Sequence, residues 1–512
     1  MDRYLSPDSY WLNSDLPAHH PPLATDVTTD VTTDVAIIGA GITGLTAADF
    51  LTRAGRKVIV LEAGRVGSGT TGGTSAHLDA HPEESPRTHI RDFGEEAART
   101  FTRCRLHAID HIERRIAELG GGCDFNRVNG YQYTEHPDRT DSLRELIPDW
   151  RRLGLEAFDD AGGIGLPFPV AFAVRFPGMA RFHPMEYLQK LADAVTAAGG
   201  TIYEQTRAAI PEAGNPCVVG TDRGGTVRAN AVIVATHSAY LGISNFDLRV
   251  YPYQSYVIAA RVSQPAGDAL YWDNEEPYHY TRIAGTADPT LLLIGGADHK
   301  TGESIDERDG WMKLEDYARK RYGDFTVERR WSAELFEPDD GLPYAGAVPS
   351  MKNVYLATGL SGIGLTNGTA CGQLLADLIV GRDNPLASIF SPARFKPLAE
   401  GREFIKENFD VARQFVKGKF LDPLSVRSLD EVPKGSGQLV SYKGHTLAVY
   451  RDETGLTHAL SPACTHAGCN VHWNMAESTW DCPCHGGRYS ATGERLYGPP
   501  PKDLEQRPLQ QL

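Results

Sequence analysis

The stretch Asp34-Val35-Ala36-Ile37-Ile38-Gly39-Ala40-Gly41-Ile42-Thr43-Gly44-Leu45 decides the fold of the larger part of this chain. Its apolar run at residues 34–38 ends in a glycine, as a buried parallel strand does. Residues 42–54 then have the pattern of a helix that stops at Gly55, and residues 57–61 that of a second strand. Together these segments predict a βαβ unit.

Within this stretch Gly39, Gly41 and Gly44 match G-x-G-x-x-G at a strand-to-helix junction. Gly39 permits the tight turn, Gly41 lets the backbone approach a pyrophosphate, and Gly44 allows close packing of helix on strand. The helix N-terminus favours phosphates because its N–H groups are unpaired and its dipole is positive there. Glu62 ends the second strand and can accept hydrogen bonds from a ribose 2′-OH. A lone glycine fingerprint is weak, but strand, helix, second strand and acid together predict a dinucleotide site.

Two further glycine-rich segments specify the cofactor. Residues 67–73 contain Gly69, Thr71 and Gly72. An NAD domain has no obvious use for such a loop, whereas FAD proteins bring one beside the pyrophosphate and the flavin ring. Residues 359–364, which contain Gly359, Gly362 and Gly364, open another helix and can aim backbone N–H groups at the flavin N1/O2 edge. These segments favour FAD.

The remaining pattern predicts an α/β domain with a second sheet. Helices are expected at residues 95–119 and 184–198 and after the turn at 359–364, and apolar strands at 201–205, 231–235, 291–295 and 354–357. Residues 251–262 and 278–283 have the pattern of strands in a separate antiparallel sheet. His107 and His111 lie one turn apart, and we expect them on a solvated helix face rather than in a metal pair. Residues 1–380 are predicted to form the first domain, 381–423 a connector with a helix around 400–417, and 424–512 the last domain.

Near the end of the chain a second set of residues has the spacing of an iron–sulfur site. Cys464-Thr465-His466 is followed, after fifteen intervening residues, by Cys482-Pro483-Cys484-His485. Two thiolates can hold one iron of a [2Fe–2S] cluster and two imidazoles the other, so Cys464, His466, Cys482 and His485 are the predicted ligands. Two Cys and two His also suit structural zinc. Zinc leaves Cys469 unexplained, together with Cys484, although each lies beside a ligand and can bridge the two ligand loops.

This segment resembles the Rieske domain of the cytochrome bc type, whose boxes read C-T-H-x-G-C and C-P-C-H-G-S. The run Gly498-Pro499-Pro500-Pro501 resembles the loop that covers the cluster. The serine of the second box is Gly487 here, while Tyr489 is retained, so we expect Gly487→Ser to add a hydrogen-bond donor and raise the midpoint potential. A Cys469–Cys484 disulfide would be unusual in a reducing cytosol, and its redox state stays open.

Residues 1–380 resemble the D-amino-acid/glycine oxidase family of flavoproteins, also called DadA-like. The matching motifs are D-V-A-I-I-G-A-G-I-T-G-L, V-I-V-L-E-A-G, A-V-I-V-A-T, D-G-L-P-Y-A-G and V-Y-L-A-T-G-L-S-G-I-G-L-T. The resemblance implies a Rossmann-like FAD-binding domain interleaved with an antiparallel-sheet substrate domain, followed by a small all-β Rieske domain. Nearly the whole chain is then similar to bacterial DadA-like oxidoreductases that carry a Rieske appendage.

The same resemblance implies oxidation of a C–N bond, with hydride passing to flavin N5. Family members that act on amino acids hold the carboxylate with an arginine of the antiparallel sheet, and Arg282 is the first candidate for that role. His299 and Lys300 form a second polar cluster, and ordinary salt bridges are the alternative for all three. His77 follows the flavin-loop glycines and could attach FAD covalently, although its local pattern matches such relatives poorly.

A flavin exchanges two electrons and a Rieske cluster one at a time. We therefore expect a dehydrogenase that oxidises an amino acid or an N-methylated amine and passes electrons through the cluster to an external one-electron carrier. The alternatives are a flavin or Rieske monooxygenase, and a redox sensor in which the cluster feeds or reports on the flavin. A Rieske oxygenase needs a mononuclear iron site, for which no convincing ligand set is present.

Composition limits the partners and the location. The chain has 512 residues, 41% of them apolar, with a formal net charge of −15 and interspersed acids and bases. A chain with this charge does not provide the basic surface that binds nucleic acid or anionic lipid. No apolar stretch approaches the roughly 20 residues of a membrane span, and the beginning of the sequence lacks a secretory pattern. We therefore expect a cytoplasmic protein.

Overall fold

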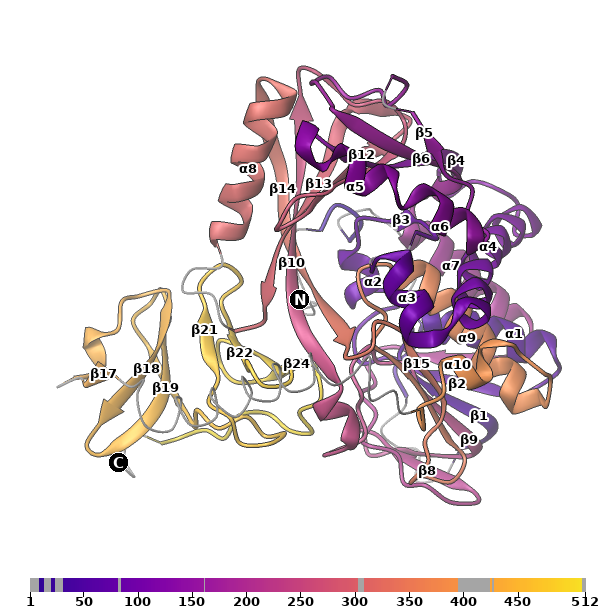
Figure 1. Ribbon diagram of the computed structural model, residues 1–512. Coiled ribbons are helices and arrows are strands. Elements are labelled where there is room, and N and C mark those ends of the chain that lie inside the picture. Colours follow the sequence, from indigo (N-terminus) through magenta and orange to yellow (C-terminus); the bar gives the residue numbers. More distant parts are fainter. Residues whose placement is uncertain are drawn as a thin grey trace.

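The computed structural model describes residues 9–12, 20–23, 31–81, 84–160, 162–302, 308–394, 424–425 and 428–508. Two large sheets build the first domain, and two four-stranded sheets build a C-terminal module (Figure 1). This mixed α/β architecture with a small all-β end is the predicted fold class.

The first large sheet carries the βαβ unit at its centre. Its strand order is β15-β16-β9-β1-β2-β7, with β8 beside β9, and β1 is parallel to both of its neighbours. Buried Val, Ile and Ala fill β1 and β2, as burial on both faces requires. Gly39 therefore leaves β1 at the carboxyl edge in the middle of the sheet, where α/β proteins bind nucleotides. The strands are β1 (Val31–Ile38), β2 (Val58–Leu61), β7 (Thr201–Tyr203), β8 (Cys217–Gly220), β9 (Thr226–Val234), β15 (Tyr344–Ala347) and β16 (Val354–Thr358).

Helices α1 and α9 pack closely beside this sheet. A Cβ on Gly372 would lie 2.6 Å from the carbonyl oxygen of Thr43, so only glycine allows this approach. On α4, His107 is exposed as expected, but the expectation for His111 is wrong. His111 is buried and stacks on Phe50 at 4.8 Å, because its side of α4 faces α1. The helices of the first domain are α1 (Ile42–Arg53), α2 (Thr70–Gly73), α3 (Pro86–Phe93), α4 (Glu95–Glu118), α5 (Thr140–Arg144), α6 (Ile147–Arg152), α7 (Pro184–Ala197), α8 (Arg308–Tyr322), α9 (Gly364–Val380) and α10 (Leu386–Ile389), with short 3₁₀ turns η1 (Pro137–Arg139) and η2 (Asn245–Leu248).

The second large sheet is antiparallel through most of its width and has the order β14-β10-β13-β12-β11-β4-β6-β3, with β5 beside β6. The predicted strands at residues 251–262 and 278–283 fall on β10 and β12. The apolar run at residues 291–295 lies inside β13, which pairs with both of them. The strands are β3 (His77–Leu78), β4 (Asn126–Thr134), β5 (Phe158–Asp159), β6 (Phe172–Arg181), β10 (Val250–Val262), β11 (Leu270–Asp273), β12 (His279–Gly285), β13 (Asp288–Lys300) and β14 (Phe325–Pro338).

The C-terminal module consists of the sheets β17-β18-β19-β20 and β21-β22-β23-β24. Residues 395–423, which hold most of the predicted connector and its helix around 400–417, lie outside the described residues. Among the helices that the structure describes, none is long and apolar enough to cross a membrane. The elements are β17 (Leu424–Ser425), η3 (Leu429–Glu431), β18 (Ser436–Tyr442), β19 (His445–Arg451), β20 (Thr457–Leu460), β21 (His472–Asn474), β22 (Thr479–Asp481), β23 (Arg488–Ser490) and β24 (Arg495–Tyr497).

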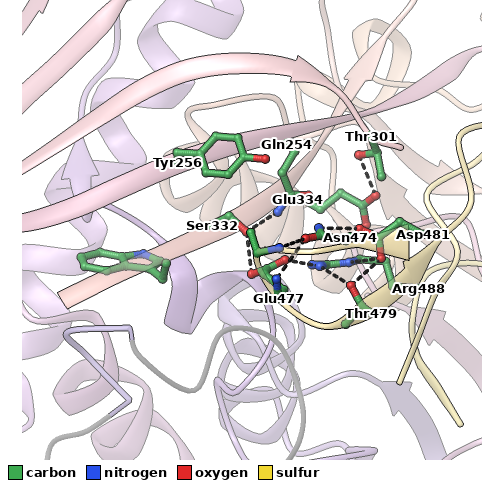
Figure 2. Close-up of polar contacts among 12 residues, drawn as sticks. Gln254, Tyr256, Thr301, Ser332, Glu334, Asn474, Glu477, Thr479, Asp481 and Arg488 are labelled. Atoms are coloured by element: carbon green, nitrogen blue, oxygen red, sulfur yellow. Dashed lines mark hydrogen bonds and ion pairs between the residues drawn. The ribbon is translucent and has the colours of Figure 1, made fainter. Parts of the chain in front are cut away.

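A buried polar network joins the module to β10 and β14 (Figure 2). Ser332 on β14 accepts a hydrogen bond from Gln254 and donates one to Glu477 Oε1 at 2.6 Å. The other oxygen of Glu477 pairs with Arg488, whose Nε also donates to Asp481 at 3.1 Å. Arg488 is 2% exposed, so its charge is compensated by these carboxylates rather than by water.

Replacing Arg488 with methionine should therefore destabilise the protein by about 3–5 kcal/mol, since it leaves buried carboxylates without their cation. Urea unfolding followed by circular dichroism measures this difference. The matched control is Arg507→Met, which breaks a pair whose side chains are 44% and 66% exposed and should cost less than about 1 kcal/mol. Equal effects of the two variants would contradict the buried-charge interpretation.

Candidate functional site

The glycine fingerprint forms a cradle between β1 and α1. Gly39 has φ +103°, and a Cβ there would lie 2.5 Å from the carbonyl oxygen of Ala235. A Cβ on Gly44 would overlap the carbonyl oxygen of Gly39, and one on Gly41 would lie 3.1 Å from Thr71 Oγ1. The backbone thus requires glycine at the turn (Gly39) and at the helix packing contact (Gly44), while Gly41 leaves room beside Thr71. The cradle fits the pyrophosphate of a dinucleotide.

Glu62 lies at the end of β2 beside this cradle. Its two carboxylate oxygens accept hydrogen bonds from the backbone N–H groups of Ala40 and Gly64, each at 2.8 Å. Burial raises the pKa of Glu62, and these two donors oppose the shift. The side chain lines the adjoining cavity, where a ribose hydroxyl would find it.

The other two glycine-rich segments border the same space. Thr71 Oγ1 accepts a hydrogen bond from the Ile42 N–H at 3.2 Å, which ties the second loop to the start of α1. Gly69 and Thr71 line the cavity, as do Gly362 and Gly364 at the start of α9. Gly72 and Gly359 shape the turns instead. A Cβ on Gly72 would lie 2.6 Å from the Gly67 carbonyl oxygen, and Gly359 has φ +67°.

One cavity of about 660 Å³ runs from the cradle to the antiparallel sheet. This volume is within the usual range for small-molecule sites. Its lining includes the glycine loops with Glu62, the antiparallel sheet, and residues 495–498 and 500 of the C-terminal module. The sheet contributes Gln132, Tyr253, Ser255, Trp272, Tyr280 and Asp298, and Tyr278 lies just before β12.

The three predicted substrate residues are not among the described residues that line this cavity. Arg282 is completely buried, and its guanidinium donates to the carbonyl oxygens of Ala76 and Ala284, each at 3.0 Å, beneath the ring of Trp11. His299 donates through Nδ1 to the carbonyl oxygen of Lys300 at 2.8 Å, so Nε2 accepts from Tyr256 at 2.9 Å. Lys300 is itself buried. The position of Arg282 therefore does not support a direct carboxylate clamp.

Three carboxyl groups that sequence reasoning missed line the cavity. Burial raises the pKa of Asp79 to about 7, that of Asp298 to about 6 and that of Glu337 to about 7. No motif marked these positions, although Asp79 follows the flavin-loop glycines by a few residues. His77 also lines the cavity, and burial lowers the pKa of its ring to about 3, so it is neutral. The local sequence pattern around His77 disfavours a covalent link to FAD.

The four predicted cluster ligands converge in the C-terminal module. The thiols of Cys464 and Cys482 are buried, and the rings of His466 and His485 meet edge to face at 4.9 Å. Cys469 and Cys484 form a disulfide. His466 Nδ1 has no hydrogen-bond partner among the described residues, and Nε2 lies 3.5 Å from Asp247 Oδ2. Two free thiols beside two histidines, one of them with an unsatisfied buried nitrogen, fit a [2Fe–2S] cluster.

Tyr489 and Gly487 shape the surroundings of Cys464. The Tyr489 hydroxyl donates to Cys464 Sγ at 3.2 Å. A Cβ on Gly487 would lie 2.6 Å from Pro500 Cγ and 3.2 Å from Cys464 Sγ. Serine at position 487 would therefore displace the covering loop. A change in midpoint potential in Gly487→Ser would then combine the effect of the new hydroxyl with the effect of the moved loop. Tyr489 offers the cleaner test.

Tyr489→Phe should lower the midpoint potential of the cluster. The hydroxyl stabilises the more negative reduced state, and one such hydrogen bond contributes about 1 kcal/mol. That energy corresponds to about 40 mV for a one-electron couple. A redox titration followed by EPR measures the shift, with Tyr442→Phe in the other sheet of the module as the control. An unchanged or higher potential in Tyr489→Phe would rule out this contribution.

Comparison with known proteins identifies both parts of the chain. The family model "FAD dependent oxidoreductase" (DAO) matches residues 34–378, and the Rieske [2Fe-2S] domain model matches residues 422–508. YhfW of Bacillus subtilis (strain 168), named as a Rieske 2Fe-2S iron-sulfur protein, is 32% identical over 98% of this chain and 97% of its own length. Gamma-glutamylputrescine oxidoreductase of Escherichia coli (strain K12) is 28% identical over 68% of this chain and 83% of its own. Glycine oxidase of Geobacillus kaustophilus shares the fold, with a TM-score of 0.61 and 24% identity over 71% of this chain and 99% of its own.

Proposed function

This chain belongs to the FAD dependent oxidoreductase family and carries a C-terminal Rieske [2Fe-2S] domain, and on that premise we propose that it is an amine or amino-acid dehydrogenase. It oxidises a C–N bond and delivers electrons through the Rieske cluster to an external one-electron carrier. Bound FAD would supply two-electron hydride acceptance, and the cluster would supply one-electron transfer.

The chain's own residues would bind the cofactor and manage the amine proton. The cradle at Gly39, Gly41 and Gly44 would hold the pyrophosphate, and N–H groups at the start of α9 would stabilise negative charge on the flavin ring. An amine must be neutral to give up hydride, so its ammonium proton needs an acceptor. Asp79 and Glu337, whose pKa values burial raises to about 7, can take that proton near neutral pH.

The observation that carries the proposal is a short segment of the module that faces both cofactor sites. Tyr497 lines the flavin cavity, and its hydroxyl lies 3.0 Å from Thr70 Oγ1 in the second glycine loop. Pro500 lines the same cavity and is the neighbour against which Gly487 packs beside Cys464. Pro500 therefore borders both the cavity and the surroundings of the predicted ligand Cys464. This arrangement supports electron transfer within one chain.

Anaerobic mixing of the holoenzyme with a panel of amines and amino acids tests this function. The flavin absorbance and the EPR signal of the reduced cluster are followed in the same samples. A substrate should bleach the flavin and produce the cluster signal before any carrier is added. Flavin bleaching without a cluster signal would contradict the electron route, and hydroxylation of an added aromatic with NAD(P)H would instead favour a monooxygenase. If no compound bleaches the flavin, a redox sensor becomes the better description.

A further inference from the structure

The sheet end of the cavity, meaning the part lined by β10–β13 and by residues 274–278, has a one-sided charge. Its acidic lining residues are Asp273, Glu275, Glu276 and Asp298, and the described lining there contains no Lys or Arg. The two lining arginines, Arg207 and Arg495, lie at the nucleotide end. Arg207 donates to the Arg495 carbonyl at 3.3 Å, and its charge acts on Glu62.

Arg282, a cation on β12, is not among the described residues that line the cavity. Its Nη1 and Nη2 donate to the carbonyl oxygens of Ala76 and Ala284. A substrate carboxylate at the sheet end would thus meet carboxylates, and no Lys or Arg among the described lining residues there could pair with it. Such a juxtaposition of like charges in a partly desolvated site is strongly unfavourable.

Among these acids Glu275 and Asp298 each have a buried oxygen without a hydrogen-bond partner among the described residues, but Glu275 Oε1 lies 3.1 Å from His136 Nε2. Asp273 bonds to His279 at 2.9 Å, and Glu275 bonds to Arg139 at 3.2 Å. Glu276 is exposed. Asp298 Oδ1, by contrast, is buried and has no hydrogen-bond partner among the described residues. A buried carboxylate oxygen that aims into a cavity needs a donor, and the ligand would supply it.

Aromatic rings and a hydroxyl flank Asp298 in the same cavity. Tyr278 and Tyr280 both line it, with ring centroids 6.0 Å apart. The Tyr280 hydroxyl lies 3.1 Å from Ser255 Oγ, and Ser255 and Tyr278 hydrogen-bond with Asp298. A carboxylate beside tyrosine rings is an arrangement that binds ammonium groups, through charge pairing and cation–π attraction.

We propose that the substrate is an aliphatic amine with a second, distal cationic group and no carboxylate near it, and that Asp298 binds this distal cation between Tyr278 and Tyr280. The inference rests on the proposed amine oxidation and narrows its substrate class. It excludes simple amino acids, because the sheet end offers their carboxylate no cation. A diamine binds more tightly than an amine with an uncharged end because its distal ammonium pairs with Asp298 Oδ1.

A matched four-carbon series tests the proposal on the holoenzyme: 1,4-diaminobutane, butylamine and 4-aminobutanoate, with glycine added. These amines differ only in the distal group, which is a cation, a methyl group or an anion. Calorimetric titration measures binding without turnover, and anaerobic flavin reduction measures reactivity. The diamine should bind at least tenfold more tightly than butylamine, and 4-aminobutanoate and glycine more weakly than butylamine.

Asp298→Asn should reduce the affinity for the diamine to that for butylamine while leaving butylamine binding unchanged. Asp298→Glu, which keeps the charge, should retain part of the preference, and the surface variant Asp316→Asn should retain all of it. FAD absorbance and melting temperature verify that each variant is folded and loaded. The proposal would be overturned if 4-aminobutanoate or glycine bound as tightly as the diamine or more tightly. It would also be overturned if Asp298→Asn weakened the binding of the diamine and of butylamine equally, or if none of the compounds bound. The predicted binding order without flavin reduction would instead refute the oxidation and leave the cation site standing.

Discussion

Cys482→Ser will abolish the EPR signal of the Rieske cluster while amine-dependent bleaching of the flavin persists. The thiolates of Cys464 and Cys482 are the two sulfur ligands that the module offers to one iron, and a serine hydroxyl does not replace a thiolate there. Turnover with a one-electron carrier should fall by at least about 100-fold, because losing a ligand exceeds the 10–100-fold cost of changing an outer-shell partner.

The matched control for this variant is Cys104→Ser. Cys104 is a free, partly buried cysteine on α4, far along the chain from the cluster loops, and its loss should leave both signals intact. Loss of the flavin spectrum in Cys482→Ser would point to a folding defect rather than to a broken route. Full turnover with oxygen alone after both Cys482 and His485 are replaced would refute the dehydrogenase.

Gly44→Val will yield protein without bound FAD. A Cβ at this position overlaps the carbonyl oxygen of Gly39, so α1 must move away from β1 and take its N-terminal N–H groups with it. Overpacking of this kind costs about 1–3 kcal/mol or more. If that strain is expressed in binding, FAD affinity falls by about fivefold to more than 100-fold.

The FAD content per chain and the dissociation constant from fluorescence quenching measure this effect. Gly162→Ala is the control, because a Cβ there meets nothing within 4 Å. A normal FAD content in Gly44→Val would mean that the cradle does not hold the cofactor. The cluster EPR signal should survive in Gly44→Val, since the module has its own hydrophobic core.

The parts of the site that short sequence motifs specify could be predicted from the sequence. The family, the fold class, FAD and the [2Fe–2S] cluster are confirmed, because glycine spacing and Cys/His spacing are local patterns with few alternatives. The predicted strand at residues 34–38 and the helix from 42 to 54 match β1 and α1 closely. A buried parallel strand followed by a glycine turn leaves the chain little choice.

The substrate residues could not be predicted in the same way. Arg282 lies on the expected strand, but its side chain is held by the Ala76 carbonyl oxygen and the Trp11 ring, and both residues are far away in sequence. His111 was expected in solvent because helical spacing alone does not reveal that α1 covers it. Asp298 and Tyr497 belong to no motif, and only tertiary packing brings them to the cavity. The domain boundaries and the roles of His299 and Lys300 stay predictions.

Thr70 and Tyr497 touch although they are 427 positions apart, and Arg495 reaches Tyr240 in the same region. Truncating the polypeptide ahead of residue 424 would open one flank of the flavin chamber to water as well as deleting the iron site. The flavoprotein domain and the C-terminal module are therefore poor candidates for exchange as independent domains. A flavoenzyme of this lineage that dispensed with its C-terminal extension would have to rebuild that flank from its own loops.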